Sequence, residues 1–118
     1  MADFEARIEL IWLMDFYGPL LTEHRREVMR LYCEEDLSLA EIAEQLGITR
    51  QGVSDALKKA RAQLEDYENK LGLAARYRAL GEEAKHCLDA LDRVRGSDGD
   101  QPHLSQARRA LENIINER

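Results

Sequence analysis

Apolar residues recur at helical spacing along most of the chain, and the first such run predicts a helix from Asp3 to Tyr17. Its expected inward side chains are Phe4, Ile8, Ile11, Trp12 and Phe16. Gly18 and Pro19 end this helix, because proline disfavours helical backbone in the residue before it. Thr22 is placed to cap a second helix, with an expected buried face of Val28, Leu31 and Tyr32. The acidic run Glu34-Glu35-Asp36 is interpreted as a solvated loop.

A short helix follows, and its ends are marked by the residues that usually mark them. Ser38 and Glu41 form an S-x-x-E capping box, in which each side chain accepts a hydrogen bond from an amide at the helix start. Gly47 is placed to end the helix in a left-handed conformation, and Thr49 to cap the next helix. The buried face of the short helix is expected to be Leu39, Ile42, Ala43 and Leu46.

A long helix then begins, and it carries a heptad seam. The seam is Val53, Leu57, Ala60, Leu64, Tyr67 and Leu71, and Gly72 breaks it. A second seam with a shifted phase is Leu73, Tyr77, Leu80, Ala84, Cys87, Leu91 and Val94. We expect the two long helices to pack against each other or against a partner helix. A final helix from His103 to Asn116 is expected to bury Leu104, Ala107, Leu111 and Ile114.

The stretch from Leu39 to Lys58 fits a helix-turn-helix. That motif needs a small residue where its two helices cross and a glycine in the turn, and Ala43 and Gly47 stand there. The expected core positions are all apolar: Ile42, Leu46, Ile48, Val53 and Leu57. The sequence therefore predicts an all-α fold with a helix-turn-helix domain over residues 1–72, a packing helix over 73–95, a linker over 96–102 and a loosely attached C-terminal helix over 103–118.

The charges and cysteines narrow the class of protein. The net charge of −6 opposes non-specific nucleic-acid binding by the chain as a whole. Cys33 and Cys87 have no CxxC partner, so we expect reduced, buried thiols in a cytoplasmic protein. No apolar run approaches the roughly 18 residues that a membrane span needs, so we expect no membrane insertion. The histidines are scattered and no phosphate-cradling glycine motif occurs, so we expect neither metal, cofactor nor enzymatic activity.

The outward face of the second helix of the motif decides between a nucleic-acid site and an ordinary solvated surface. Its candidate binding residues are Thr49, Arg50, Gln51, Ser54, Asp55, Lys58, Lys59 and Arg61. Four basic residues against one acidic residue make the stretch 49–61 +3 in a chain of −6. Arg50 and Gln51 are placed to reach base edges, and Lys58 and Lys59 to reach phosphates. Asp55 would repel phosphate unless it reads a cytosine amino group or pairs with Arg50 or Lys58.

From Phe16 to Leu71 the sequence resembles the YlxM (UPF0122) family of small bacterial helix-turn-helix proteins. The matching segments are Phe16-Tyr17, Leu20-Leu21-Thr22, Leu31-Tyr32, Asp36, Ser38 to Glu44, Arg50 to Asp55 and Leu64 to Leu71. The resemblance implies a DNA-binding fold similar to region 4 of sigma factors. It also implies a gene neighbourhood with the signal-recognition-particle GTPase Ffh and a role in that pathway. Gly52 stands where alanine is often seen, which weakens the helix by up to about 1 kcal/mol, and no family pattern extends beyond Arg95.

Two hypotheses of different classes remain open. A nucleic-acid-binding accessory or regulatory protein, with DNA or signal-recognition-particle RNA as its partner, agrees with the motif and its basic segment. A helical protein-interaction module that modulates Ffh agrees with the negative charge and the apolar seams. We also expect a homodimer through the seam from Val53 to Leu71, although packing against the segment from Leu73 to Val94 explains the same residues.

Overall fold

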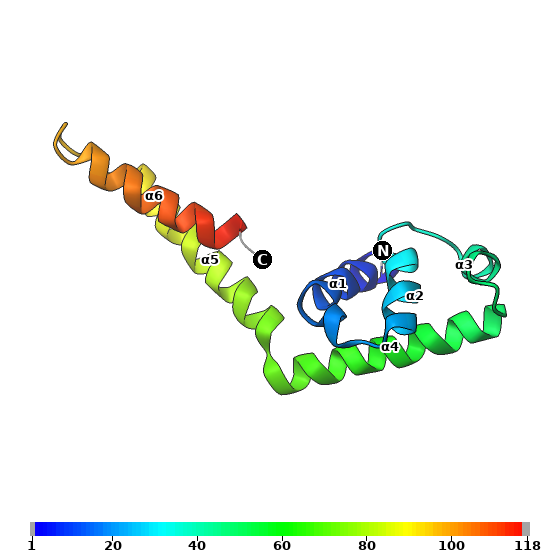
Figure 1. Cartoon of the computed structure of the whole chain (residues 1–118). Helices are drawn as coiled ribbons and strands as arrows, with labels where there is room; N and C mark the ends of the chain where they lie inside the picture. Colours follow the sequence, from blue (N-terminus) through cyan, green and yellow to red (C-terminus); the bar gives the residue numbers. More distant parts are fainter. Residues whose placement is uncertain (1, 117–118) are drawn as a thin grey trace. The chain divides into compact units, whose positions relative to one another are not determined.

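A computed structural model describes the backbone of residues 2–116 and the side chains of residues 6–116. Within that part all of the regular secondary structure is helical, which confirms the all-α prediction (Figure 1). The elements are α1 (Ala2–Tyr17), the 3-10 turn η1 (Gly18–Leu20), α2 (Glu23–Cys33), α3 (Leu39–Leu46), α4 (Arg50–Leu71), α5 (Leu73–Asp92) and α6 (Gln101–Asn116). None of the described helices has the length and apolar character needed to cross a membrane. The chain forms two compact units, Met1–Ala74 and Ala75–Arg118.

The helix ends of the first unit lie where local sequence chemistry predicts them. The Thr22 hydroxyl accepts a hydrogen bond from the Arg25 amide at 3.3 Å, and Ser38 and Glu41 form both hydrogen bonds of the capping box. Gly47 ends α3 with a φ of 67°, and Gly72 ends α4 with a φ of 63°. Because a Cβ is strongly disfavoured at such angles, these two glycines fix where the helices stop.

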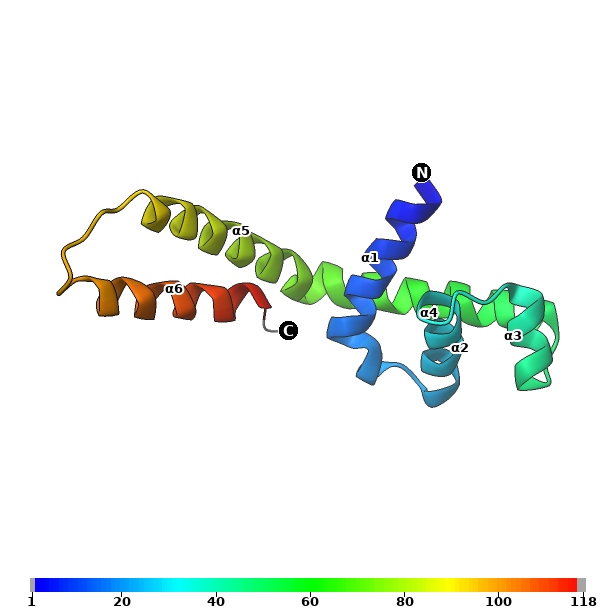
Figure 2. The ribbon, with the colours of Figure 1, turned by 90° about the horizontal axis from the view of Figure 1, so that it is seen from above.

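The core of the first unit lies along one side of α4, where α1, α2 and α3 follow one another (Figure 2). One cluster joins α1 and α2 to the second half of α4, and its buried members are Leu10, Leu13, Tyr17, Leu21, Met29, Ala60, Leu64 and Ala74. The other joins α2 and α3 to the first half, and its buried members are Val28, Leu31, Ile42, Ala43, Val53 and Ala56. This arrangement holds the start of α4 rigidly against the short helix before it.

Most of the α4 seam is buried inside the first unit, where α1, α2 and α3 cover it. Val53, Ala60 and Leu64 are buried by α1, α2 and α3, whereas Leu71 is 56% exposed. The three preceding helices supply the apolar surface for the buried part of the seam, and a dimer through this seam stays a prediction.

The predicted inward face of α1 is also wrong. Leu10, Leu13 and Tyr17 face the core, whereas Ile8 and Ile11 are exposed. Trp12 and Phe16 are half-buried and stack at 6.1 Å between ring centroids, and the side chain of Phe4 lies outside the described residues. The helix carries apolar residues on more than one side, and periodicity alone cannot choose between them.

A buried tyrosine of α1 lies at the junction between α4 and α5. Gly72 ends α4, so the first amides of α5 need acceptors outside the helix. The Tyr17 hydroxyl accepts from the Leu73 amide at 3.1 Å and donates to Glu68 Oε1 at 2.5 Å. The same Glu68 oxygen accepts from the Ala74 amide at 3.0 Å. Tyr17 and Glu68 thus cap the beginning of α5.

The second unit is an antiparallel hairpin of α5 and α6. The row of α5 that faces α6 is Tyr77, Gly81, Ala84, Leu88 and Leu91, and the row of α6 that faces α5 is Leu104, Arg108, Leu111 and Ile115. Tyr77 donates to the Ile114 carbonyl at 3.1 Å, and Arg108 pairs with Asp92. Leu80, Cys87, Val94, Ala107 and Ile114 were predicted to be inward but are exposed, and so is Leu73 at the start of α5. The inward row of α5 includes Gly81, which a search for large apolar residues passes over.

Candidate nucleic-acid interface

The turn between α3 and α4 has the geometry that a helix-turn-helix requires. Ala43 is 7% exposed and lies in the same cluster as Val53 and Ala56 of α4, so its small side chain lets the two helices approach closely. The Ile48 amide donates to the Ala43 carbonyl at 3.0 Å, which closes the turn around Gly47. Val28 and Leu31 of α2 fill the space behind both helices.

The eight predicted site residues lie together at the start and along the first half of α4, but they do not have equal roles. Thr49 caps the helix: its hydroxyl accepts from the Gly52 amide at 2.9 Å. A Cβ built on Gly52 would lie 3.2 Å from that oxygen, so glycine here leaves room for the cap. Ser54 is half-buried. The remaining residues are exposed: Arg50, Gln51, Asp55, Lys58, Lys59 and Arg61.

The exposed residues form two rows, each beside a surface hollow. Arg50 and Ser54 line a hollow of about 340 Å³ that also touches Leu39 at the start of α3. Ser54 continues into a second hollow of about 190 Å³, whose apolar floor is bordered by Lys58 and Arg61. On the other side, Asp55 and Lys59 line a hollow of about 210 Å³ beside α2. The outward face of α4 therefore has a longer row that contains the basic residues Arg50, Lys58 and Arg61. It also has a shorter row that contains Asp55 and Lys59.

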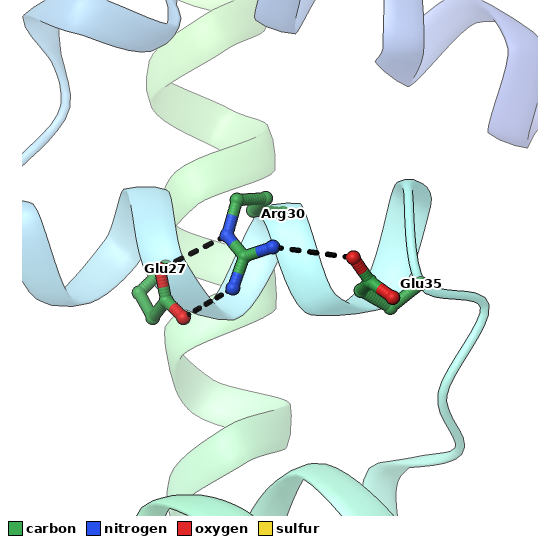
Figure 3. Close-up of polar contacts among 3 residues, drawn as sticks. All are labelled: Glu27, Arg30 and Glu35. Carbon is green, nitrogen blue, oxygen red and sulfur yellow. Dashed lines mark hydrogen bonds and ion pairs between the residues drawn. The ribbon is translucent and has the colours of Figure 1, made fainter.

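Arg50, Lys58, Lys59 and Arg61 share a further property: none forms an ion pair within the described part of the chain. Several cations elsewhere in the chain are paired with acids. Arg30 of α2 lies between Glu27, at 2.7 Å, and Glu35, at 3.4 Å (Figure 3). Its hydrogen bond to Glu27 lowers the pKa of that carboxyl. These four cations of α4 are therefore available to an external anion, whereas the fifth, Lys70, is paired with Asp66.

The loop predicted as solvated, residues 34–36, is exposed but makes specific contacts. Glu35 pairs with Arg30, and Asp36 pairs with Arg7, which also lies 4.6 Å above the Tyr32 ring. Asp36 adopts a left-handed φ of 54°. These acids are thus committed to cations of α1 and α2, not to those of α4.

Asp55 has a partner that the sequence did not reveal. Its carboxylate accepts a hydrogen bond from Gln51 Nε2 at 3.0 Å, so neither Arg50 nor Lys58 is its partner. The pair is exposed, and one turn of helix separates its members. Base contact by Gln51 would require this hydrogen bond to be exchanged for one to the base.

Two basic residues of α2 also border the face and were missed at the sequence level. His24 and Arg25 line the hollow that contains Asp55 and Lys59. Arg25 Nη1 donates to Gln63 Oε1 at 2.9 Å, which ties α2 to α4. No local pattern marks these residues, because their place beside α4 follows from packing between helices distant in sequence.

Potential metal ligands and thiols are further candidate functional groups of the described residues. The described residues contain no group of three or more potential metal ligands. Cys33 is half-buried, and burial raises the pKa of its thiol. Cys87 was predicted to be a buried structural thiol but is exposed, because it precedes Leu88, the residue that faces α6.

Comparison of the sequence with those of known proteins identifies the family of this chain. Residues 4–96 match the family model of UPF0122, described as "Putative helix-turn-helix protein, YlxM / p13 like". A UPF0122 protein of Desulforamulus reducens is 41% identical over 108 residues, which is 90% of each chain. One of Symbiobacterium thermophilum is 43% identical over 99 residues, 84% of this chain and 85% of the relative. The chain belongs to the UPF0122 family, as the resemblance of its sequence indicated.

Proposed function

We propose that this protein is a cytoplasmic nucleic-acid-binding accessory or regulatory protein and that the outward face of α4 is its binding surface. The observation that carries the proposal is the set of four exposed cations without ion pairs on the second helix of a helix-turn-helix. They stand in a chain whose net charge is −6. Although the protein has many carboxylates, none of those in the described structure pairs with these four cations. A surface of unpaired cations is suited to binding phosphate.

The order of residues along α4 suggests how the surface would be used. A recognition helix enters the major groove by its N-terminal end, so Arg50 and Gln51 are the proposed base contacts. Lys58, Lys59 and Arg61 follow within the next turns and are the proposed phosphate contacts. Ser54 and Asp55 lie between the two groups, and Thr49 fixes the start of the helix. Exposed amides at that end add a further attraction for phosphate.

The test is a pair of double variants with the same change in net charge. Arg50→Gln with Lys58→Gln removes two unpaired cations from the face. Lys70→Gln with Lys85→Gln removes two cations that are paired with Asp66 and Glu82. At low salt we expect the first variant to bind a labelled duplex or RNA roughly tenfold or more weakly, because one proposed base contact and one proposed phosphate contact are lost. The second should bind like the native chain. Equal affinities for all three would remove α4 from the account.

The identity of the nucleic acid is proposed from the family resemblance and not from the surface of α4. The family resemblance supports a link to the signal recognition particle, so its RNA stands beside DNA as a proposed ligand. Sequencing of nucleic acid that co-purifies with the chain at low salt separates the two. Enrichment of the particle's RNA supports the first ligand, and enrichment of promoter DNA supports the second. Recovery of neither would contradict the proposal.

A second candidate function is a helical module that binds Ffh and changes its GTPase rate. The negative net charge favours it, because outside residues 49–61 the acids far outnumber the bases in the first unit. The assay is the Ffh GTPase rate with its RNA, measured with the native chain and with the Arg50 and Lys58 double variant. An effect that survives the double substitution favours protein contact. No effect of either protein excludes this candidate.

A further inference from the structure

The hairpin of α5 and α6 buries little between its two helices. α6 has no buried residue, and Ala84 is the only buried residue that α5 contributes within the second unit. The other facing residues are half-buried, including Tyr77, Leu88 and Leu111. Two helices with so small an interior do not offset the conformational entropy lost on ordering them. The hairpin therefore needs a further apolar contact.

The geometry of an antiparallel pair shows on which face that contact lies. Successive residues of a helix are about 100° apart around its axis. The residue that precedes each inward residue therefore lies to one side of its helix. Because α5 and α6 are antiparallel, the preceding residues of both helices point to the same face of the hairpin. We call this the open face. Its members are Arg76, Leu80, Glu83, Cys87, Ala90, His103, Ala107, Ala110 and Ile114, and all are exposed.

The opposite face is made of the residues that follow the inward rows, and it has a different character. Its members are Arg78, Glu82, Lys85, Asp89, Asp92, Ser105, Arg109, Glu112 and Asn116, all of them polar. On the open face most members are apolar, and Leu80 and Ile114 are 52% and 43% exposed. This contrast is typical of helices that pack on a partner.

We propose that the open face is covered by the open face of a second copy of this chain, which completes a four-helix bundle. The charges of the face indicate this occupant and its direction. Arg76 and Glu83 are its only acidic or strongly basic residues, and neither has an ion pair in the described structure. With α5 antiparallel to α5 of the second copy and Leu80 at the two-fold axis, Arg76 of each copy lies opposite Glu83 of the other. Parallel pairing in register would place like charges opposite each other.

This dimer differs from the one expected from the α4 seam and does not rest on the proposed function. If both hold, the dimer joins two helix-turn-helix units in one particle, and linkage of two binding sites raises the overall affinity for a long nucleic acid.

Disulfide cross-linking of the full chain tests the pairing and its direction. In a background of Cys33→Ser and Cys87→Ser, the Leu80→Cys variant should form a reducible covalent dimer on mild oxidation, because the two introduced thiols meet at the axis. The matched control, Asp89→Cys on the opposite face, should not. The native Cys87 should not cross-link to its copy. The two Cys87 positions are offset by about 21 Å along the antiparallel helices, far beyond the span of a disulfide.

Sedimentation with charge exchange provides the second measurement. Arg76→Glu should weaken the dimer by roughly tenfold, because it places carboxylates opposite each other. Adding Glu83→Arg to that variant should restore it, since the exchanged charges again oppose each other. The proposal is overturned if the native chain is monomeric at about 100 μM, if Leu80→Cys cross-links no better than Asp89→Cys, or if Cys87 cross-links to itself. None of these readouts uses nucleic acid, so failure here leaves the proposed function standing.

Discussion

Replacement of Tyr17 by phenylalanine tests the role of its hydroxyl at the junction between α4 and α5. Tyr17 is 1% exposed, and its ring contacts Tyr67 with 5.8 Å between centroids. The substitution keeps that ring and opens no cavity. It removes the hydroxyl that donates to Glu68 and accepts from the Leu73 amide. Any loss of stability therefore measures the hydroxyl alone.

The magnitude follows from the two hydrogen bonds. A hydrogen bond to a charged group contributes about 1.5–3 kcal/mol, and a neutral one about 0.5–1.5 kcal/mol. Part of this is offset, because phenylalanine has no hydroxyl to desolvate and Glu68 keeps its hydrogen bond from the Ala74 amide. We expect Tyr17→Phe to lower the free energy of unfolding by about 1.5–3 kcal/mol. We also expect faster hydrogen exchange at the Leu73 amide.

Urea denaturation at 25 °C measures the change, with Tyr67→Phe as the matched control. The Tyr67 hydroxyl accepts one hydrogen bond from Gln63 at 3.0 Å and is half-buried, so its removal should cost less than about 1 kcal/mol. If the stability of Tyr17→Phe lies within about 0.5 kcal/mol of the native chain, or the substitution costs no more than the control, the hydroxyl does not stabilise this junction.

Alkaline pH supplies an independent check of the same residue. Burial, followed by the hydrogen bond to Glu68, raises the pKa of the Tyr17 phenol above its ordinary value of 10.0. The stability that this shift contributes is fully present below pH 10 and is lost as the pH rises through the folded-state pKa. The difference in stability between the native chain and Tyr17→Phe should therefore narrow above pH 10. A difference that stays constant to higher pH would contradict the shift.

Further predictions concern the helix-turn-helix and the thiols. Thr49→Ala should cost about 1 kcal/mol in thermal unfolding by loss of the α4 cap, whereas Thr49→Ser should cost little. Ile42→Ala, at a position with 0% exposure, should cost about 2–5 kcal/mol. Hydrogen bonding from the Ser38 amide lowers the pKa of Glu41. The native chain should therefore lose stability relative to Glu41→Gln as the pH falls below about 4.5. Parallel curves of unfolding free energy against pH for the two proteins would refute this. Cys87 should be alkylated at pH 8 much faster than Cys33, whose burial raises its thiol pKa, and equal rates would be inconsistent with the packing of Cys33.

Features set by local chemistry were predictable from the sequence, and choices between packing faces were not. The capping box of Ser38 and the left-handed Gly47 depend on residues within a few positions, so the sequence locates the turn. The inward face of α1 depends on which of two apolar stripes reaches α4. Leu10, Leu13 and Tyr17 do so, and Tyr17 gains hydrogen bonds from residues far along the chain. Such a gain has no local signature.

The candidate site shows the same division. The exposure of Arg50, Lys58 and Lys59 follows from their place opposite the apolar stripe of α4, and the sequence predicts it. The hydrogen bond between Gln51 and Asp55 depends on the rotamers of both side chains, and other partners lie within one helical turn of Asp55, so the sequence does not predict it. His24 and Arg25 reach the site only because α2 packs on α4. Contacts of the last kind become visible only in three dimensions.

The dependence of nucleic-acid affinity on salt concentration tests the central claim most directly. Each phosphate contact contributes about 0.9 to the slope of log K against log salt on duplex DNA and about 0.7 on a single strand. If Lys58, Lys59 and Arg61 bind phosphate, the native slope should be about −2 to −3, and substitution of Lys58 and Lys59 by glutamine should reduce its magnitude by roughly 1.5–2. A slope near zero, or one that the double substitution leaves unchanged, would contradict the assignment of α4 as a nucleic-acid-binding surface.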